Sequence, residues 1–177
     1  MSAARIVTES TAIAGASIDG LEFAREGRRL AGQVAVTALS RLAEVLVGDA
    51  GALNCEIAGE RDRDGKAWLT MALSGSLNLR CQRCLAALVF PVDISSRFLL
   101  IPQGQPWPDE DLAEDGFDAI AAEKEMALLP LIEDEVLLAL PIAPRHESCE
   151  PPAPVIEENE PSPFAALARL RRSIGEG

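Results

Sequence analysis

Apolar and polar residues alternate with a period of two over much of the first hundred residues. Leu53, Cys55 and Ile57 alternate with polar or small neighbours, and a second alternating run covers residues 67–73. An Asp-Gly dipeptide, typical of a tight turn, lies between the two runs. The pattern predicts a β-hairpin in which Cys55 is an inward, structural thiol that behaves as a small hydrophobic residue.

The same period continues into a Cys-x-x-Cys pair formed by Cys81 and Cys84. A further apolar run covers residues 85–94, and residues 97–101 extend or follow it. The pair is therefore predicted to lie at a tight turn between strands. Pro91 cannot donate a hydrogen bond to a neighbouring strand, so it indicates an edge strand or a bulge.

Two segments have the i, i+3, i+4 spacing of apolar residues that is typical of an amphipathic helix. The first covers residues 33–47 and the second covers residues 127–140. In the second segment the acidic run Glu133, Asp134 and Glu135 is predicted to face solvent. The chain is thus predicted to be an α+β protein with an antiparallel β-sheet packed with two helices.

The composition along the chain predicts one domain and a tethered tail. Residues 1–149 form the single α+β domain, which contains an acidic loop at 109–118. Residues 150–163 form an acidic, Pro-rich linker, and residues 164–177 form a short C-terminal helix and tail, too short to be stable without docking on something. Trp107, just before the acidic loop, is either a docking anchor or a lid over the core.

The net charge of −12 lies entirely in the last two fifths of the chain. Residues 1–108 contain 11 basic and 11 acidic residues, whereas residues 109–177 contain 5 basic and 17 acidic residues. An acidic surface repels phosphates, so broad nonspecific binding of nucleic acid is disfavoured and a basic protein partner is favoured. Alternatively, the acidic loops only keep the protein soluble.

No apolar run approaches the roughly 18–20 residues that span a bilayer. Residues 1–13 also lack a basic region followed by an apolar stretch, so we expect no signal peptide and no membrane partner. The protein is accordingly predicted to be cytoplasmic.

Three of the four cysteines and the only histidine form two short pairs, Cys81-x-x-Cys84 and His146-x-x-Cys149. Zinc prefers four tetrahedral nitrogen or sulfur ligands, and a C-x-x-C turn presents two thiolates to one ion. One structural zinc would then join the sheet to the end of the second helix. Two other interpretations stay open, namely reduced, partly buried cysteines without a metal and redox chemistry.

The redox interpretation requires a thiolate with a depressed pKa, which Arg80 and Arg83 could help to supply, but the cysteines do not open a helix in a βαβ pattern. Other catalytic motifs, such as G-x-S-x-G, H-E-x-x-H and phosphate-binding glycine loops, are absent from the sequence. We therefore predict no catalytic residues and no small-molecule substrate.

Three segments together resemble the YceD family, the large ribosomal RNA subunit accumulation proteins. They are LRCQRCL at 79–85, IEDEVLLALPIAPRH at 132–146 and SPFAALARL at 162–170. The resemblance covers the chain from about residue 30 to its end. It implies a role in the accumulation, and hence the processing or protection, of large-subunit (23S) ribosomal RNA, and it does not imply an enzyme.

The predicted function is a non-catalytic ribosome biogenesis factor whose partner is large-subunit ribosomal RNA, a basic ribosomal protein or a processing factor. Six arginines are the candidates for contact with RNA or a partner: Arg80, Arg83, Arg145, Arg169, Arg171 and Arg172. One alternative is a metal-dependent nuclease that uses Glu133, Asp134 or Glu135 with the acidic loop. Another is a protein-interaction module with a structural zinc, whose tail helix docks into a groove on its partner.

Overall fold

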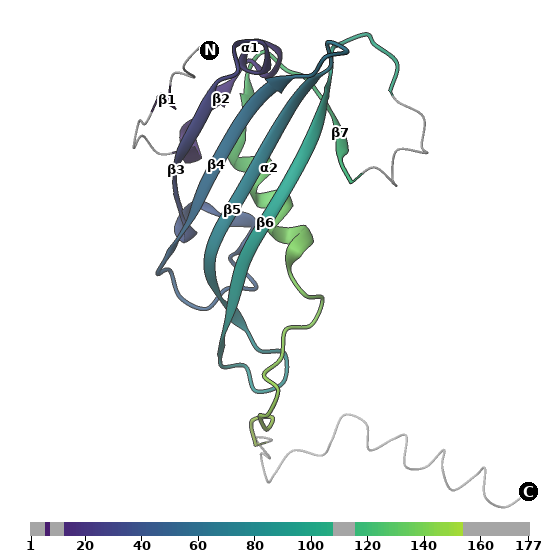
Figure 1. Cartoon of the computed structure of the whole chain (residues 1–177). Helices are drawn as coiled ribbons and strands as arrows, with labels where there is room; N and C mark the ends of the chain where they lie inside the picture. The colour runs from purple at the N-terminus through teal and green to yellow at the C-terminus, as the bar shows by residue number, and fades with distance from the viewer. Residues whose placement is uncertain (1–5, 8–12, 108–115, 154–177) are drawn as a thin grey trace, which may run out of the picture.

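The computed structural model describes residues 6–7, 13–107 and 116–153 (Figure 1). A six-stranded sheet with the strand order β1-β3-β4-β5-β6-β7 forms its body. The strands of this sheet are β1 (Ile6–Val7), β3 (Arg29–Ala35), β4 (Ala52–Arg61), β5 (Ala67–Arg80), β6 (Ala87–Ile101) and β7 (Asp118–Ala121). Two short strands, β2 (Ser17–Ile18) and β8 (Met126–Ala127), pair separately.

The four central strands are antiparallel, as the alternating pattern predicts, whereas β1 and β7 pair in parallel with their neighbours at the two edges. In the predicted hairpin, β4 and β5 pair from Asn54 with Ser74 to Arg61 with Ala67. Because side chains alternate between the two faces of a strand, this register places the apolar residues of both strands on one face. The hairpin prediction is confirmed.

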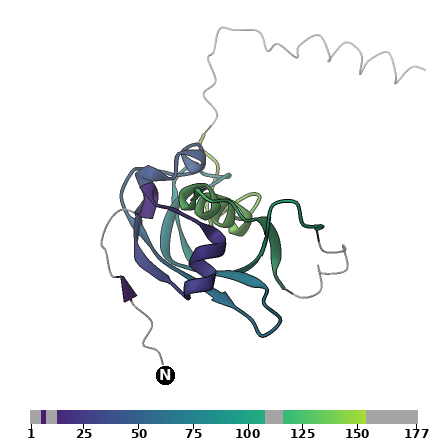
Figure 2. The same ribbon diagram turned by 90° about the horizontal axis from the view of Figure 1, so that it is seen from above.

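Two α-helices cover that face, α1 (Gly20–Glu26) and α2 (Leu128–Ala139). Seen from above, both lie on the same side of the curved sheet (Figure 2). The predicted helix at 127–140 is confirmed as α2, and Pro130 lies in its first turn, where a missing N–H costs little. In the part of the chain that the structure describes, neither helix is long and apolar enough to cross a membrane.

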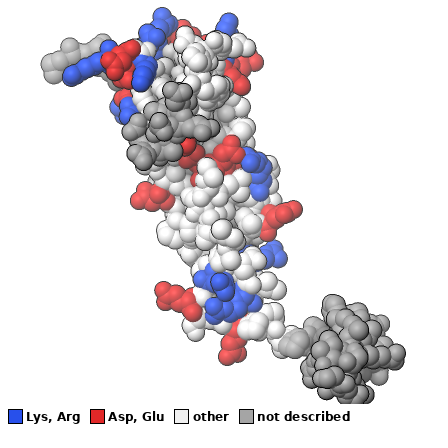
Figure 3. Space-filling view, turned by 90° about the vertical axis from the view of Figure 1, so that its right-hand side faces the viewer, with Lys and Arg blue, Asp and Glu red and all other residues white. Residues whose placement is uncertain are grey.

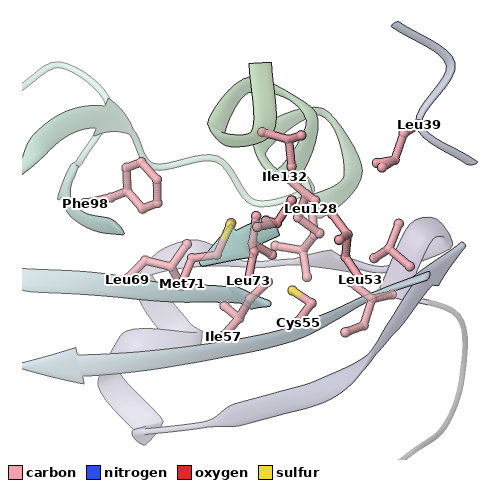
Figure 4. Packing of buried hydrophobic residues seen from close by; sticks show 14 of the residues in the cluster. Leu39, Leu53, Cys55, Ile57, Leu69, Met71, Leu73, Phe98, Leu128 and Ile132 are labelled. Atoms are coloured by element: carbon pink, nitrogen blue, oxygen red, sulfur yellow. The ribbon is translucent and has the colours of Figure 1, made fainter. Parts of the chain in front are cut away.

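The core lies between the sheet and α2 (Figure 4). Leu128 and Ile132 of α2 are fully buried against residues of β4 and β5 such as Leu53, Met71 and Leu73. Phe23 and Phe98 are the only aromatic residues among the largest fully buried side chains of the described chain. The others are Leu, Ile and Met. This leaves the packing to aliphatic side chains, in agreement with the composition.

The predicted helix at 33–47 is wrong. This segment finishes β3, continues through two 3₁₀ turns, Val36–Ala38 and Ser40–Leu42, and then bridges to β5 through Leu46. Four of the five apolar residues on which the prediction rested, Val36, Leu39, Leu42 and Leu46, are nevertheless buried, whereas Ala43 is exposed. A 3₁₀ turn repeats every three residues, so it buries nearly the same positions as an α-helix.

The other helix of the fold is α1, which the spacing of apolar residues did not predict. Its local signals are strong, because the Asp19 side chain caps the helix by accepting a hydrogen bond from the Glu22 amide, and Gly27 ends it in the left-handed conformation. The α+β class with a sheet and two packed helices is therefore confirmed, with α1 in place of the helix at 33–47. The predicted C-terminal helix at 164–177, most of the linker at 150–163 and most of the acidic loop at 109–118 lie outside the described residues.

Candidate functional site

The Cys-x-x-Cys pair lies at the tight turn that joins β5 to β6, as predicted, at the end of the molecule farthest from α1 (Figure 1). Hydrogen bonds from the Cys81 amide to the Ala86 carbonyl and from the Leu85 amide to the Cys81 carbonyl, both 2.9 Å, close the turn. Leu85 has a φ of 63° and is the only non-glycine residue of the described chain with a positive φ. The turn thus brings both thiols to one side of a compact loop.

The segment that follows α2 returns to this turn. The Gln82 amide donates to the Pro144 carbonyl over 2.8 Å, which holds residues 145–149 beside the cysteines. The four candidate ligand atoms, from Cys81, Cys84, His146 and Cys149, all lie within 4.8 Å of one another. The tertiary structure therefore unites the two pairs that the sequence presents 62 positions apart.

The distances in this cluster suit a tetrahedral metal ion. Two sulfurs bound at roughly 2.3 Å to one tetrahedral zinc lie about 3.8 Å apart. The Cys81 and Cys149 sulfurs are 3.8 Å apart, and the Cys84 sulfur is 3.3 Å from His146 Nδ1. Zinc accepts this Cys₃His donor set, so the residues fit the ion without a change of fold.

The histidine is also oriented for this role. His146 Nε2 lies 3.1 Å from the carbonyl oxygen of Ala87. A carbonyl oxygen only accepts, so Nε2 carries the proton and Nδ1 of the neutral ring keeps its lone pair toward the sulfurs. Such a bond on the far ring nitrogen is a common way to fix a metal-binding histidine.

The surroundings of the cluster shift the pKa values of the Cys81 and Cys149 thiols in opposite directions. Burial by itself would raise the pKa of Cys81, but backbone amides that donate to its sulfur, those of Cys84, Arg83 and His146, lower that pKa to about 5. For Cys149, burial raises the pKa, and the neighbouring Cys81 and Cys84 sulfurs raise it further. One preformed thiolate in a crowded sulfur cluster is a favourable starting point for binding a cation.

Three of the six candidate arginines surround this cluster, and we call Arg80, Arg83 and Arg145 the arginine surface. Arg83 Nη1 donates to the Cys149 carbonyl over 3.2 Å, while Arg80 and Arg145 are exposed. Figure 3 shows basic side chains gathered at the lower end of the molecule, with acidic side chains beside and below them. The other three candidates, Arg169, Arg171 and Arg172, lie outside the described residues.

The carboxylates of α2 do not form the solvent-facing cluster that the sequence predicts. Glu133 and Glu135 are buried, and only Asp134 is exposed. Glu133 accepts a hydrogen bond from the Arg41 amide at 3.0 Å, Asp134 pairs with the Arg41 side chain, and Glu135 accepts from the Ser96 hydroxyl. Glu133 and Asp134 both contact Arg41, and Glu135 contacts Ser96. Among the described residues, these three carboxylates do not form a group that could hold one metal ion.

Cys55 is buried on β4, away from the cluster. Burial, and to a smaller extent the charge of Glu56, raises the pKa of its thiol to about 12. A thiol with this pKa is almost fully protonated near neutral pH, which agrees with the structural role predicted for it.

Trp107 does not cover the core, because 59% of its surface is exposed. It lines a cleft of about 1220 Å³ together with residues such as Leu99 and Phe117. The alternating pattern gave no sign of this cleft, since its lining comes from loops and strand ends that are distant in sequence. The prediction of a lid over the core is therefore wrong, and the role of Trp107 as a docking anchor stays a prediction.

Comparison with known proteins supplies the context for this site. The family described as "Large ribosomal RNA subunit accumulation protein YceD" matches residues 69–171, a range that contains the whole cysteine and histidine cluster. A Haemophilus influenzae protein named "Large ribosomal RNA subunit accumulation protein YceD" is 27% identical over 168 residues, which cover 88% of this chain and 95% of that protein. No solved structure shows significant similarity to the chain.

Proposed function

Because the chain belongs to the YceD family of large ribosomal RNA subunit accumulation proteins, we propose that it is a non-catalytic ribosome biogenesis factor. It supports the accumulation of large-subunit ribosomal RNA in the cytoplasm, through contact with that RNA or with a basic ribosomal protein or processing factor. The observation that carries the proposal is the family match over residues 69–171.

The cysteine and histidine cluster has a structural role in this proposal. One zinc ion held by Cys81, Cys84, His146 and Cys149 would tie the β5–β6 turn to the segment after α2. The ion supplies a cross-link and no reaction. The cross-link would hold Arg83 and Arg145 near each other. Arg83 lies between Gln82 and the ligand Cys84, Arg145 lies between Pro144 and the ligand His146, and Gln82 and Pro144 are hydrogen-bonded.

Zinc content is tested by elemental analysis of freshly purified protein. We expect one zinc per chain, and we expect Cys81→Ser to lose it, because that thiol belongs to the cluster and is fully buried. Cys55→Ser serves as the matched control and keeps the metal. Metal-free wild-type protein with reactive thiols would remove the zinc from the proposal without affecting the role in ribosome biogenesis.

Direct contact with RNA is tested by titrating full-length protein with a large-subunit ribosomal RNA fragment at several salt concentrations. The arginines would bind phosphates, so affinity falls steeply with salt. Replacing Arg83 and Arg145 with Ala reduces the slope of log affinity against log salt by about 1 to 2. Replacing Arg25, in the last turn of α1, and Arg28, just after that helix, changes the opposite end of the fold and leaves the slope unchanged.

The outcomes separate the candidate partners. Absence of RNA binding, together with capture of a basic ribosomal protein, would assign the contact to protein. Cleavage of a precursor RNA with magnesium or manganese, abolished by Asp134→Ala, would overturn the non-catalytic proposal. The separate partners of Glu133 and Glu135 argue against that result.

The division of the chain into a domain at 1–149, a linker at 150–163 and a tail at 164–177 is part of the same proposal. The described residues stop at 153, so the sequence alone supports the last two parts.

A further inference from the structure

Two thiols of the cysteine and histidine cluster lie in contact with each other. The Cys81 and Cys149 sulfurs are 3.8 Å apart, and all four cysteines of the chain are free. The sulfurs of a disulfide are about 2.05 Å apart, so these two atoms would have to approach by less than about 2 Å to be joined. A small movement of one chain segment is therefore enough to bring them to bonding distance.

The third thiol of the cluster is less free to join either of these two. The Cys84 sulfur lies 3.3 Å from His146 Nδ1, so it already has a partner. It also shares a tight turn with Cys81, which is closed by the hydrogen bonds from the Cys81 amide to the Ala86 carbonyl and from the Leu85 amide to the Cys81 carbonyl. We expect a bond between the Cys81 and Cys84 sulfurs to strain this turn, because both atoms are anchored in it.

The segment that carries Cys149 is held more loosely than the turn. In the described chain, residues 145–153 make no hydrogen bond between backbone groups, and the Arg83 side chain donates to the Cys149 carbonyl over 3.2 Å. The Cys149 side chain is also partly exposed, whereas Cys81 is fully buried. An oxidant in solution therefore reaches the Cys149 sulfur before that of Cys81, and the Cys149 sulfur can move toward Cys81 without distorting the turn.

We propose that Cys81 and Cys149 form an oxidation site, at which hydrogen peroxide converts the two thiols into a disulfide in preference to a bond within the Cys-x-x-Cys pair. The Cys149 thiolate attacks one peroxide oxygen, the O–O bond breaks and hydroxide leaves, which gives a sulfenic acid. The Cys81 thiolate then attacks the Cys149 sulfur, the S–S bond forms and the sulfenic oxygen leaves as a second hydroxide. The peroxide gains the two electrons that the two sulfurs lose.

This disulfide would join the same two segments that the proposed zinc joins, namely the β5–β6 turn and the chain after α2. A bond between Cys81 and Cys84 would lie within the turn and would join no other segment to it. Oxidation of Cys81 and Cys149 leaves only Cys84 and His146 for the metal, so zinc leaves while the cross-link remains. Only the release of metal rests on the zinc proposed above, because the disulfide forms from the thiols alone.

The linkage is tested by treating full-length protein with hydrogen peroxide, blocking the remaining thiols and digesting without a reductant. Trypsin cleaves after arginine, and at least one arginine separates each cysteine from the next, so mass spectrometry of the tryptic peptides distinguishes every possible disulfide. The bond between Cys81 and Cys149 should be several times more abundant than any other and should disappear after treatment with dithiothreitol. A predominant bond from Cys84 to either of them, a predominant bond between two copies of the chain, or no disulfide at all would overturn the proposal.

Two variants that each lack one thiol test whether this pair reacts by itself. Cys55→Ser removes the thiol buried on β4 and should give the same disulfide at the wild-type rate. Cys84→Ser removes the rival partner and should still give the bond between Cys81 and Cys149. Loss of that bond in Cys84→Ser, with its retention in Cys55→Ser, would count against the proposal, and the peptide map of the wild type decides alone if Cys84→Ser does not fold.

Two further measurements separate this inference from the proposed zinc. A chromogenic chelator should detect one zinc released for each disulfide formed, whereas protein purified without zinc should still form the disulfide. With metal removed by a chelator, trypsin should cleave the native protein after Arg145 several times more slowly in the oxidised form than in the reduced form. Equal cleavage rates would show that the disulfide does not replace the metal as a cross-link.

Discussion

Asp62 organises the turn between β4 and β5 through a single carboxylate. One oxygen accepts hydrogen bonds from the amides of Asp64 and Lys66, at 3.0 and 2.8 Å, and the other accepts from the Trp68 indole at 2.8 Å. The bond from Trp68 is the main reason that the pKa of Asp62 lies below its ordinary value of 3.8. Arg97 stacks on the Trp68 ring, with its guanidinium carbon 3.9 Å from the ring centroid.

This lowered pKa makes the turn sensitive to acid. A carboxylate with a folded-state pKa below its unfolded-state pKa stabilises the fold above the unfolded value, and that stability is lost as the pH falls through the folded value. We expect Asp62→Asn to lower the melting temperature at pH 7 and to flatten its decline between about pH 4 and pH 2. Thermal melts by circular dichroism across this range test the prediction.

Asp64→Asn is the matched control, because the Asp64 side chain makes none of the turn's described hydrogen bonds. If Asp62→Asn and Asp64→Asn shifted the melting temperature equally at every pH, the role assigned to the Asp62 carboxylate would be wrong.

At the scale of elements, α1 approaches β4 so closely that only glycine fits at one position. A Cβ atom on Gly59 would lie 2.6 Å from the Phe23 carbonyl oxygen and 2.8 Å from the Ala24 Cα. Both atoms belong to the helix backbone, so they move only if the whole helix moves. This contact sets the distance between α1 and the sheet.

Replacing Gly59 with Ala should therefore lower the free energy of unfolding by about 1–3 kcal/mol, the range for overpacking a core. Gly15→Ala should change it little, since no atom lies within 4 Å of the position its Cβ would take. Urea denaturation of both variants measures the difference. A Gly59→Ala variant as stable as Gly15→Ala would show that α1 is not held at this distance.

The helix α2 contributes to the stability of the fold through the stripe of side chains that it buries, and much less through its exposed apolar residues. Ile132 is fully buried, whereas 79% of Leu138 is exposed. We expect Ile132→Ala to cost about 2–5 kcal/mol of unfolding free energy, because it leaves a cavity. Leu138→Ala should cost no more than about 0.5 kcal/mol. Urea denaturation again provides the measurement, and a large loss in Leu138→Ala would reveal a contact with residues beyond the described ones.

At the scale of the whole molecule, the core and the cysteine cluster lie at different places along the sheet. The buried residues that join β4, β5 and α2 make their contacts without the four ligand residues. In the described residues, the turn between β5 and β6 is joined to the chain after α2 by one hydrogen bond between backbone groups, from the Gln82 amide to the Pro144 carbonyl, and by the Arg83 side chain, which donates to the Cys149 carbonyl. A metal would therefore stabilise this end of the molecule more than the core.

Removal of metal by a chelator should loosen this end and leave the sheet intact. We expect the far-ultraviolet circular dichroism to persist while Cys81, Cys84 and Cys149 become reactive to a thiol reagent. Cys55, with its pKa near 12, should react only after denaturation. Reaction of all four thiols after chelation alone would show that the fold as a whole depends on the metal.

The local pattern of the sequence determined the hairpins, the helix α2 and the residues of the core, because periodicity reflects which side chains are buried. It could not decide the conformation of residues 33–47, where two 3₁₀ turns bury nearly the same positions as a helix. Nor could it place Glu133 and Glu135, whose burial depends on the Arg41 amide and the Ser96 hydroxyl. The conformation of residues 33–47 and the burial of these carboxylates depend on partners distant in sequence, and local periodicity carries no information about such partners.

For the cysteine and histidine cluster, too, one part could be predicted from the sequence and another part depended on the tertiary structure. The sequence by itself determined the two pairs and the turn on which Cys81 and Cys84 lie, since both follow from local spacing. Only the tertiary structure decided that His146 and Cys149 meet them within 4.8 Å, because that meeting depends on where the chain goes after α2. The bond from His146 to Ala87, which leaves Nδ1 facing the sulfurs, is likewise a product of the fold.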